Sequence, residues 1–344
     1  MIVDAHNDLL LELVIDRGEK RVFELVLRRG RQRLLERYWL PRLRAGGVGV
    51  QICPLYGVGE PRAQARARAL AQLAEFELAV EENADQLCQV RTRDQLDDPR
   101  LRLVLSMEGV EPLHGDVGAF QEWYDHGVRS ASLTWNQPND FAGGKDTPTR
   151  GLTDHGRRLV RRFAELGVML DLAHASEQTW RDVFVEGVPF SVTHAGCRAV
   201  CDDPRNLADW QLEALAERGG VLGMMAIAFV VDPAAPTLSR WLDHFDHAVA
   251  VMGIEHVGLG ADFVDQVGQT GPGPGRDEVL GGEPVSPDKA RLGLEGFTAP
   301  DDYPALVAAL GERGYAGERL AAITSGNWLR VLGTTLPAAA EPAA

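Results

Sequence analysis

The strongest constraint on the fold is a regular alternation of short apolar runs with longer stretches of helical spacing. Eight runs rich in Val, Ile and Leu recur along the chain: Ile2–Asp8, Val48–Tyr56, Leu101–Gly109, Val128–Trp135, Gly167–His174, Val188–Ala195, Gly219–Ala228 and Glu255–Phe263. This alternation is typical of parallel βα units, and eight such units close into a barrel. We therefore predict an α/β fold of the (β/α)8 TIM barrel kind.

Helix boundaries are visible between the apolar runs. Thr153 precedes a helical pattern that ends before Gly167, and Ser176 begins another in the same way. Further helices are expected in three stretches: a long Ala-rich one from about Pro61 to Cys88, and two closing helices outside the barrel, Pro304–Leu310 and Glu318–Leu332.

Two segments depart from the alternation. Val264–Phe297 is loaded with Gly and Pro, which predicts a long loop after the eighth strand. Such a loop could cover an active site or be an inert insertion, and its place at the catalytic rim favours the first. We expect residues 1–335 to form one barrel domain with extra C-terminal helices, and residues 336–344 to be a disordered tail.

Charge and cysteine usage exclude several classes of protein. The formal net charge of -15 would repel a phosphate backbone, so no nucleic-acid partner is expected. The four cysteines lack CxxC spacing and the start of the chain lacks the regions of a signal peptide, which predicts a cytoplasmic protein with reduced thiols. The most apolar run, Gly219 to Val231, is too short to cross a bilayer, so no membrane anchor is expected.

Five metal-competent side chains stand at the ends of four predicted strands. His6 and Asp8 are two apart on the first strand and project from the same side. Glu108, His174 and His194 end the third, fifth and sixth runs. Each alone is explained as well by a hydrogen-bonded pair, a salt bridge or a rim histidine.

Together, these residues point to a binuclear metal site. Parallel strands deliver their ends to one face of a barrel, the face where barrel enzymes do chemistry. Five ligands exceed what one catalytic zinc takes from protein while keeping an open position. The economical solution is a pair of divalent ions that activate water, with Glu108 as the bridging carboxylate.

Six motifs occur in the order found in a known family. They are Asp4–Leu9, Leu40–Gly49, Met107–Gly109, Asp171–Ser176, Pro204–Asn206 and Gly258–Phe263. As a set they resemble the membrane (renal) dipeptidase family of zinc metallopeptidases, from Ile2 to about Gly333.

The resemblance implies a barrel of the amidohydrolase kind that holds two zinc ions. The first zinc would be held by His6, Asp8 and Glu108, and the second by Glu108, His174 and His194. A hydroxide bridging the two ions would attack the amide bond of a dipeptide, including dipeptides with a C-terminal D-residue.

The resemblance also assigns two residues that contact the substrate or its protons. Arg205 would receive the terminal carboxylate of the substrate, a task that suits its planar donor fork. Asp262 would shuttle protons between the attacking water and the leaving amine, and so is, with Glu108, a predicted catalytic residue. Their alternatives are a surface ion pair for Arg205 and a buried hydrogen-bond acceptor for Asp262.

The chain departs from the family pattern near the substrate. Where the family has a histidine that steadies the oxyanion, this chain has Trp135, followed by Asn136. Trp135 offers one N–H and no charge, so it either aims a weaker donor at the substrate or only packs, with Asn136 or the metals taking over. The stretch Met224–Phe229 replaces polar and aromatic residues and predicts a more apolar pocket.

Two other functions remain open on the sequence. The same metal site could act on another small amide or a lactam, or the chain could be a catalytically silent homologue that binds a ligand through the same pocket. The ligand set would also accept manganese, iron or cobalt. A homodimer is an admissible assembly.

Overall fold

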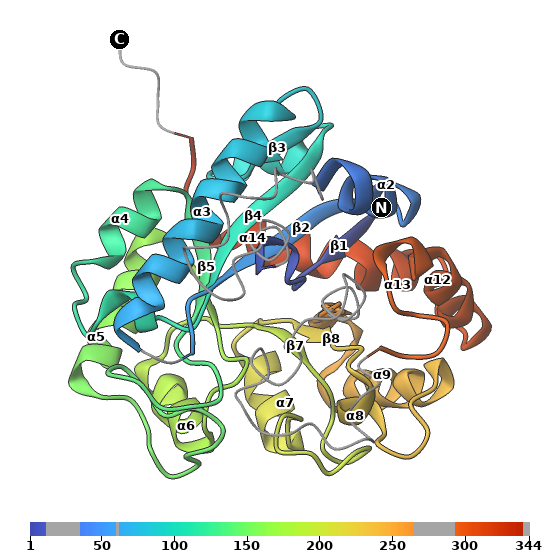
Figure 1. Ribbon diagram of the computed structural model, residues 1–344. Coiled ribbons are helices and arrows are strands. Elements are labelled where there is room, and N and C mark those ends of the chain that lie inside the picture. Colours follow the sequence, from blue (N-terminus) through green and yellow to red (C-terminus); the bar gives the residue numbers. More distant parts are fainter. Residues whose placement is uncertain (12–34, 60–61, 264–292, 340–344) are drawn as a thin grey trace.

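Parallel strands form the centre of the computed structural model, which describes residues 1–11, 35–59, 62–263 and 293–339 (Figure 1). The hydrogen-bonded order is β6-β5-β4-β2-β1-β9-β8-β7, with β3 beside β4. The strands are β1 Ile2–Asp4, β2 Val48–Tyr56, β3 Leu87–Gln89, β4 Leu101–Glu108, β5 Val128–Ser132, β6 Met169–Asp171, β7 Val192–Ala195, β8 Leu222–Met224 and β9 Val257–Leu259. A parallel bridge between Asp171 and Ser191 joins β6 to the start of β7, so eight strands close into a barrel.

Each of the eight predicted runs contains one barrel strand, so the predicted fold is confirmed. Most observed strands stop several residues before the predicted run does. β1, for example, ends at Asp4, and residues 5–8 continue as irregular backbone. The polar residues that end the runs therefore mostly lie on loops that leave the barrel at its carboxyl end.

The prediction of one helix from Pro61 to Cys88 was wrong at its end. Helix α3 covers Ala65–Glu82, and Leu87–Gln89 forms the additional strand β3, which pairs with β4. The buried Leu87 pairs with Leu101 on β4, where strand hydrogen bonds are available to its backbone. Long-range pairing thus overrides the local helical pattern.

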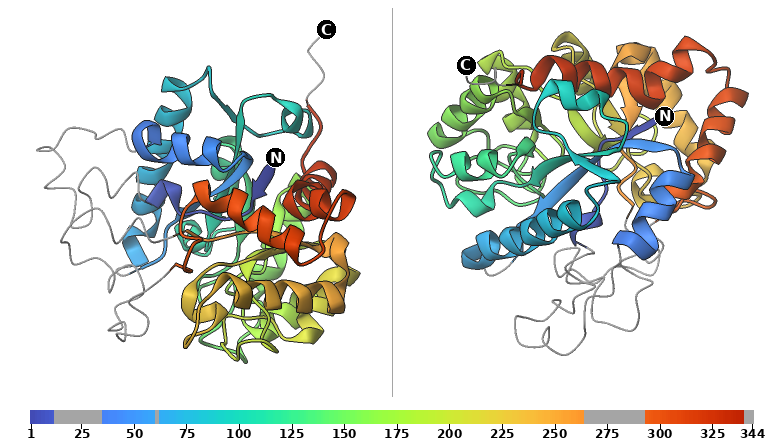
Figure 2. Two further views of the ribbon diagram at one scale, coloured as in Figure 1. Left: turned by 90° about the vertical axis from the view of Figure 1, so that its right-hand side faces the viewer. Right: turned by 90° about the horizontal axis from the view of Figure 1, so that it is seen from above.

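Helices form the outer layer of the molecule (Figure 2). They are α2 Leu40–Ala45, α3, α4 Phe120–Asp125, α5 Asp154–Leu166, α6 Glu177–Glu186, α7 Asp209–Glu217, α8 Ala228–Val231, α9 Leu238–Met252, α12 Tyr303–Glu312, α13 Glu318–Ala321 and α14 Asn327–Thr335. The predicted caps are confirmed: the side chains of Thr153 and Ser176 accept hydrogen bonds from the first turns of α5 and α6. Gly167 ends α5 with φ 70°, a left-handed conformation that favours glycine.

The closing helices differ in part from the prediction. Pro304–Leu310 lies within α12, but Glu318–Leu332 is divided into α13, a π-helical turn at Ala322–Gly326 and α14. Helix α14 packs against the amino end of the barrel (Figure 1). There the Trp328 indole donates to the Leu259 carbonyl at 3.0 Å, and a Cβ at Gly258 would lie 2.5 Å from the same indole nitrogen. Glycine is therefore required at position 258.

Two predictions, the loop after the eighth strand and the C-terminal tail, concern residues that lie mostly outside the described part of the chain. The predicted loop Val264–Phe297 lies mostly in residues 264–292, and most of the predicted tail lies in residues 340–344; both stretches are outside the described residues. Within the described residues, all four cysteines are free. No helix there is both long enough and apolar enough to cross a membrane.

Candidate metal centre

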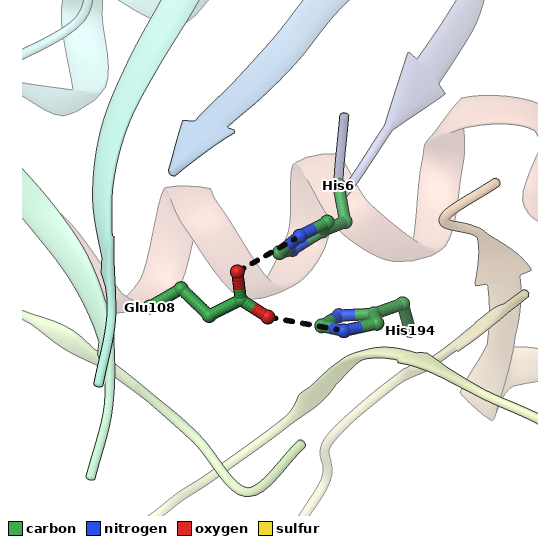
Figure 3. Close-up of side chains that lie close together, drawn as sticks. All are labelled: His6, Glu108 and His194. Atoms are coloured by element: carbon green, nitrogen blue, oxygen red, sulfur yellow. Dashed lines mark ion pairs between the residues drawn. The ribbon is translucent and has the colours of Figure 1, made fainter. Parts of the chain in front are cut away.

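The five predicted metal ligands meet at the carboxyl end of the barrel. His6 Nε2 lies 3.7 Å from Glu108 Oε2 (Figure 3). The same nitrogen lies 3.9 Å from Asp8 Oδ1. Glu108 is the last residue of β4, while His6 and Asp8 follow β1. The first predicted ligand set is thus brought together around one carboxylate oxygen.

The second predicted ligand set faces the other oxygen of the same carboxylate. His174 Nε2 lies 3.0 Å from Glu108 Oε1, and His194 Nε2 lies 3.5 Å from it. The two histidine nitrogens are themselves 3.0 Å apart. Oε2 of Glu108 is thus the oxygen that faces His6, and Oε1 is the oxygen that faces His174 and His194.

Burial sets the protonation state of these side chains. Removal from water lowers the pKa of His6 to about 3 and holds the pKa of His174 and of His194 well below the usual range, with Arg205 adding to each shift. Neutral imidazole is the form that binds metal. Burial also raises the pKa of Asp8 and of Glu108 well above the usual range, and the neighbouring carboxylates add to the rise: Asp262 for Asp8, and Asp8 and Asp262 for Glu108.

The residues present fit a bound cation. Among the described residues, His6 Nε2 and Asp8 Oδ1 are buried and have no hydrogen-bond partner. Such atoms are costly to bury unless something binds them. Imidazole nitrogen combined with carboxylate oxygen is a ligand set that zinc accepts.

Hydrogen bonds behind two of the histidines orient their Nε2 atoms toward Glu108. His174 Nδ1 lies 2.8 Å from Asn136 Oδ1, which can only accept, so the His174 proton resides on Nδ1. His194 Nδ1 lies 2.9 Å from the Thr193 hydroxyl, which donates to Asp171 Oδ2 at 2.5 Å. Partners of this kind fix the tautomer and ring orientation of metal-binding histidines.

Sequence reasoning missed these supporting roles. Thr193 and Asp171 were not singled out, although Thr193 directly precedes His194 and Asp171 lies within one of the six family motifs. Asn136 was predicted to contact substrate, and its contact with His174 was not foreseen. A strand pattern shows which residues share a face but not which loop residue reaches the back of a ring.

Asp262 lies beside the cluster, as predicted. Its Oδ1 is 3.9 Å from His6 Nε2, and its backbone N–H donates to the His6 carbonyl at 3.0 Å. Burial raises the pKa of Asp262 to about 6, an effect that Arg205 opposes. Asp262 and His174 also hold left-handed backbone conformations, with φ 58° and 63°, and strain of this kind is often concentrated at functional sites.

Arg205 is a buried cation next to the cluster. Its Nη2 donates to the His194 carbonyl at 2.7 Å, and its side chain lines a cavity of about 370 Å³ together with His174. Burial lowers the pKa of its guanidinium, while Asp262 and Glu108 favour the charged form. Arg205 therefore lies against the cluster of candidate ligands and lines the same cavity as His174.

Two aromatic side chains, Trp135 and Tyr56, pack together next to His174. The ring of Trp135 lies 5.8 Å from the His174 ring and 5.6 Å from the Tyr56 ring, measured between centroids. Tyr56 was not singled out from the sequence, although it ends the second apolar run. The available signal was its position at the carboxyl end of a strand next to β4.

The predicted apolar stretch Met224–Phe229 is divided between two clusters: Met224, Ala226 and Ala228 belong to the main core, and the other residues belong to a small cluster. The small cluster follows β8, where the side chains of Met225, Ile227 and Val230 are buried together and Phe229 packs against them. Asn206, the neighbour of Arg205, donates to the Val230 carbonyl at 2.8 Å. This cluster therefore adjoins the loop that carries Arg205.

Comparison with known families and curated proteins gives consistent matches. The family model described as membrane dipeptidase (peptidase family M19) matches residues 1–273. Dipeptidase aclJ from Aspergillus oryzae is 30% identical over 241 residues, which are 68% of this chain and 51% of that protein. The chain spans 51% to 64% of the length of three curated relatives that it matches.

Two solved structures superpose over nearly the whole chain. The dipeptidase AC, a metallopeptidase of family M19, has a TM-score of 0.80 at 26% identity and covers 98% of this chain and 99% of its own. A metallopeptidase from Rhodobacter sphaeroides, solved with a phosphinate mimic of the dipeptide L-Ala-D-Ala, has a TM-score of 0.80 at 25% identity. That superposition covers 97% of this chain and 99% of the other.

Proposed function

The chain belongs to the membrane dipeptidase family, peptidase family M19, and we propose that it is a metal-dependent enzyme that hydrolyses dipeptides. The observation that carries this proposal is the position of Glu108. One carboxylate oxygen lies 3.7 Å from His6 Nε2, and the other lies 3.0 and 3.5 Å from the Nε2 atoms of His174 and His194. The His6 and His194 rings are 3.7 Å apart between centroids, so all three histidines adjoin this one carboxylate. Such an arrangement suits two-metal hydrolysis of an amide.

The proposed cofactor is a pair of zinc ions. His6, Asp8 and Glu108 would hold one ion. Glu108, His174 and His194 would hold the other. When bound there, the ions supply a water molecule of lowered pKa and polarise the scissile carbonyl.

Arg205 is the proposed receptor for the terminal carboxylate of the substrate. Among the described residues, its guanidinium makes one hydrogen bond, to the His194 carbonyl, which leaves other donors of the planar fork for a ligand. A carboxylate bound there would lie near His194, one of the proposed ligands. This contact would orient the peptide bond toward Glu108.

Asp262 is the proposed proton carrier. The carboxyl group would take the proton that the attacking water loses and return it to the leaving nitrogen, since an amide anion is too poor a leaving group in water. A pKa raised by burial to about 6 supports this role, because a carboxyl group that titrates near neutral pH can both hold and release a proton. Its carboxylate also lies near His6, on the side of the first proposed ion.

The proposed substrates are free dipeptides, including dipeptides with a C-terminal D-residue. The structure of the Rhodobacter sphaeroides metallopeptidase contains a mimic of L-Ala-D-Ala, and this chain superposes on it over nearly its whole length. A free terminal carboxylate is the feature that Arg205 would recognise.

A dipeptide panel tests the proposal. Zinc-loaded protein should cleave L,L- and L,D-dipeptides, and should lose activity when the C-terminal carboxylate of the substrate is amidated. Arg205→Ala should lower kcat/KM for the free dipeptide by roughly 10²-fold, whereas Arg205→Lys should retain part of it because it keeps the charge without the fork. Metal-loaded protein that leaves the whole panel intact would contradict the dipeptidase function.

The alternative substrate class is another small amide or a lactam. Trp135 beside His174 and the apolar cluster of Met225, Ile227 and Val230 favour this class. An enzyme of this kind should be indifferent both to amidation of the terminal carboxylate and to Arg205→Ala. The same panel, extended with lactams, therefore separates the two functions.

A further inference from the structure

Tyr56 is the strand neighbour of Glu108. The parallel strands β2 and β4 pair in a register that sets Ile52 beside Val104 and Tyr56 beside Glu108. Ile52 and Val104 both belong to the apolar cluster inside the barrel. Since side chains alternate along a strand, Tyr56 and Glu108 also point into the barrel, at its carboxyl end.

The position of Tyr56 is fixed from two sides. The buried side chain of Gln72, on α3, accepts a hydrogen bond from the Tyr56 N–H at 2.9 Å and donates to the Tyr56 carbonyl at 2.7 Å. The Tyr56 ring meets Trp135 edge to face, with 86° between the ring planes. The phenol is thus held in place without the use of its hydroxyl.

The Tyr56 hydroxyl is a hydrogen-bond donor that is available to a ligand. Within the described parts of the chain, its oxygen takes part in no hydrogen bond. Burial, together with the nearby carboxylates of Glu108 and Asp8, raises the pKa of Tyr56 well above its usual range. An ordinary phenol already holds its proton at neutral pH, so this hydroxyl can act as a hydrogen-bond donor.

Trp135 lies between Tyr56 and His174. Its ring plane is inclined by 35° to that of His174, with 5.8 Å between the ring centroids, and it meets the Tyr56 ring edge to face. Trp135 thus packs against both Tyr56 and His174.

We propose that the Tyr56 hydroxyl donates a hydrogen bond to the substrate carbonyl oxygen as that oxygen gains negative charge. This inference rests on the proposed function, since it names the group that stabilises the transition state of amide hydrolysis. A preorganised donor in a buried site is worth far more there than in water. Gln72 and Trp135 act as positioning residues for it.

The test compares Tyr56→Phe with Tyr124→Phe, each of which removes one phenol hydroxyl and keeps the ring; Tyr124 lies on the outer helix α4. Tyr56→Phe should lower kcat by roughly 10²-fold, leave KM for the dipeptide within about threefold, and leave Tm unchanged. Binding of a phosphinate dipeptide mimic, measured by calorimetry, should weaken by a similar factor, because the mimic resembles the transition state. Tyr124→Phe should change kcat and phosphinate affinity by less than about threefold.

The outcomes separate this inference from the proposed function. If wild type cleaves dipeptides while Tyr56→Phe keeps its kcat and its phosphinate affinity, the role of Tyr56 is wrong and the dipeptidase function stands. If Tyr56→Phe instead lowers Tm and raises KM without changing kcat, Tyr56 is structural and the inference is also wrong. A zinc-loaded wild type that neither cleaves dipeptides nor binds the phosphinate overturns both.

Discussion

The two ends of the barrel bury side chains of opposite character. At the amino end, Val3, Val50 and Val104 pack against Trp328 of α14, and the one indole N–H in that contact is satisfied by a backbone carbonyl. At the carboxyl end, buried carboxylates and imidazoles have displaced pKa values, and some of their atoms lack partners among the described residues. The amino end therefore supplies stability, while the carboxyl end costs stability until a cation binds.

Glu108→Gln should give the largest effect, a loss of activity without a loss of stability. The substitution removes the carboxylate that faces both histidine groups, so kcat/KM for dipeptides should fall by roughly 10⁴-fold. In chelator, stability should be unchanged or higher, because a neutral amide is easier to bury than a carboxylate. Kinetics and thermal unfolding measure the two effects, and Glu122→Gln, at an exposed position on α4, is the matched control. Near-normal activity of Glu108→Gln would remove Glu108 from the metal site.

Trp328→Ala, at the amino end of the barrel, should give the converse result: a loss of stability with activity retained. The substitution leaves a cavity under the barrel and should lower the free energy of unfolding by about 3–5 kcal/mol. Activity per folded molecule should be retained, since Trp328 lies away from the carboxyl end. Denaturant unfolding and active-site titration measure these effects, and Trp328→Phe should lose less stability. A loss of activity without a loss of stability would show that the two ends are not separable in this way.

Ionisation of Glu111, near the carboxyl end of the barrel, should make the free energy of unfolding depend on pH. Burial raises the pKa of this carboxyl, three residues after Glu108, to about 7, a shift that the hydrogen bond from Asn139 opposes. A carboxyl whose pKa is higher in the folded than in the unfolded state destabilises the fold when it ionises. Its penalty is absent below pH about 4 and complete above pH about 7.

The Glu111 prediction is checked by unfolding wild type and Glu111→Gln at a series of pH values in chelator. Glu111→Gln should be close to wild type at pH 4 and more stable by up to about 2 kcal/mol at pH 8. A difference that stays constant with pH, or that shrinks as pH rises, would mean that Glu111 is not destabilised by burial.

Asn136→Ala should give the smallest effect. Without the amide oxygen, the His174 ring loses the acceptor that fixes its tautomer, and metal affinity should fall by about 10-fold. Competition with a chromogenic chelator measures this change. Gln137→Ala is the control, because the neighbouring amide bonds to Asp146 on the exposed side of the same loop. Equal affinities for the two variants would assign Asn136 to another role, such as the substrate contact first predicted.

The contrast between the two ends also explains what the sequence could predict. Strand periodicity located all eight barrel strands, because each is buried on both faces and reads as an apolar run. The short strand β3 was missed, because its pairing with β4 depends on a partner more than ten residues away in the chain.

The residues of the site also fall into those that the sequence could predict and those that it could not. The five candidate ligands were predicted because they lie at the carboxyl ends of strands or directly after them, where position in the sequence determines position in space. The contacts of Asn136 with His174, and of Thr193 with Asp171, depend on loop paths and side-chain rotamers that no periodicity encodes. Tyr56 was overlooked because its importance arises from register with β4 rather than from its own residue type.

The most direct test of the central claim is a metal titration. Chelator-treated protein is titrated with zinc while bound metal and dipeptide hydrolysis are followed together. Activity should rise to its maximum as two zinc ions bind per chain, and His6→Ala and His194→Ala should each bind one ion fewer with high affinity. Saturation at a single ion in the wild type, or no tight binding at all, would contradict a site in which Glu108 serves two metals.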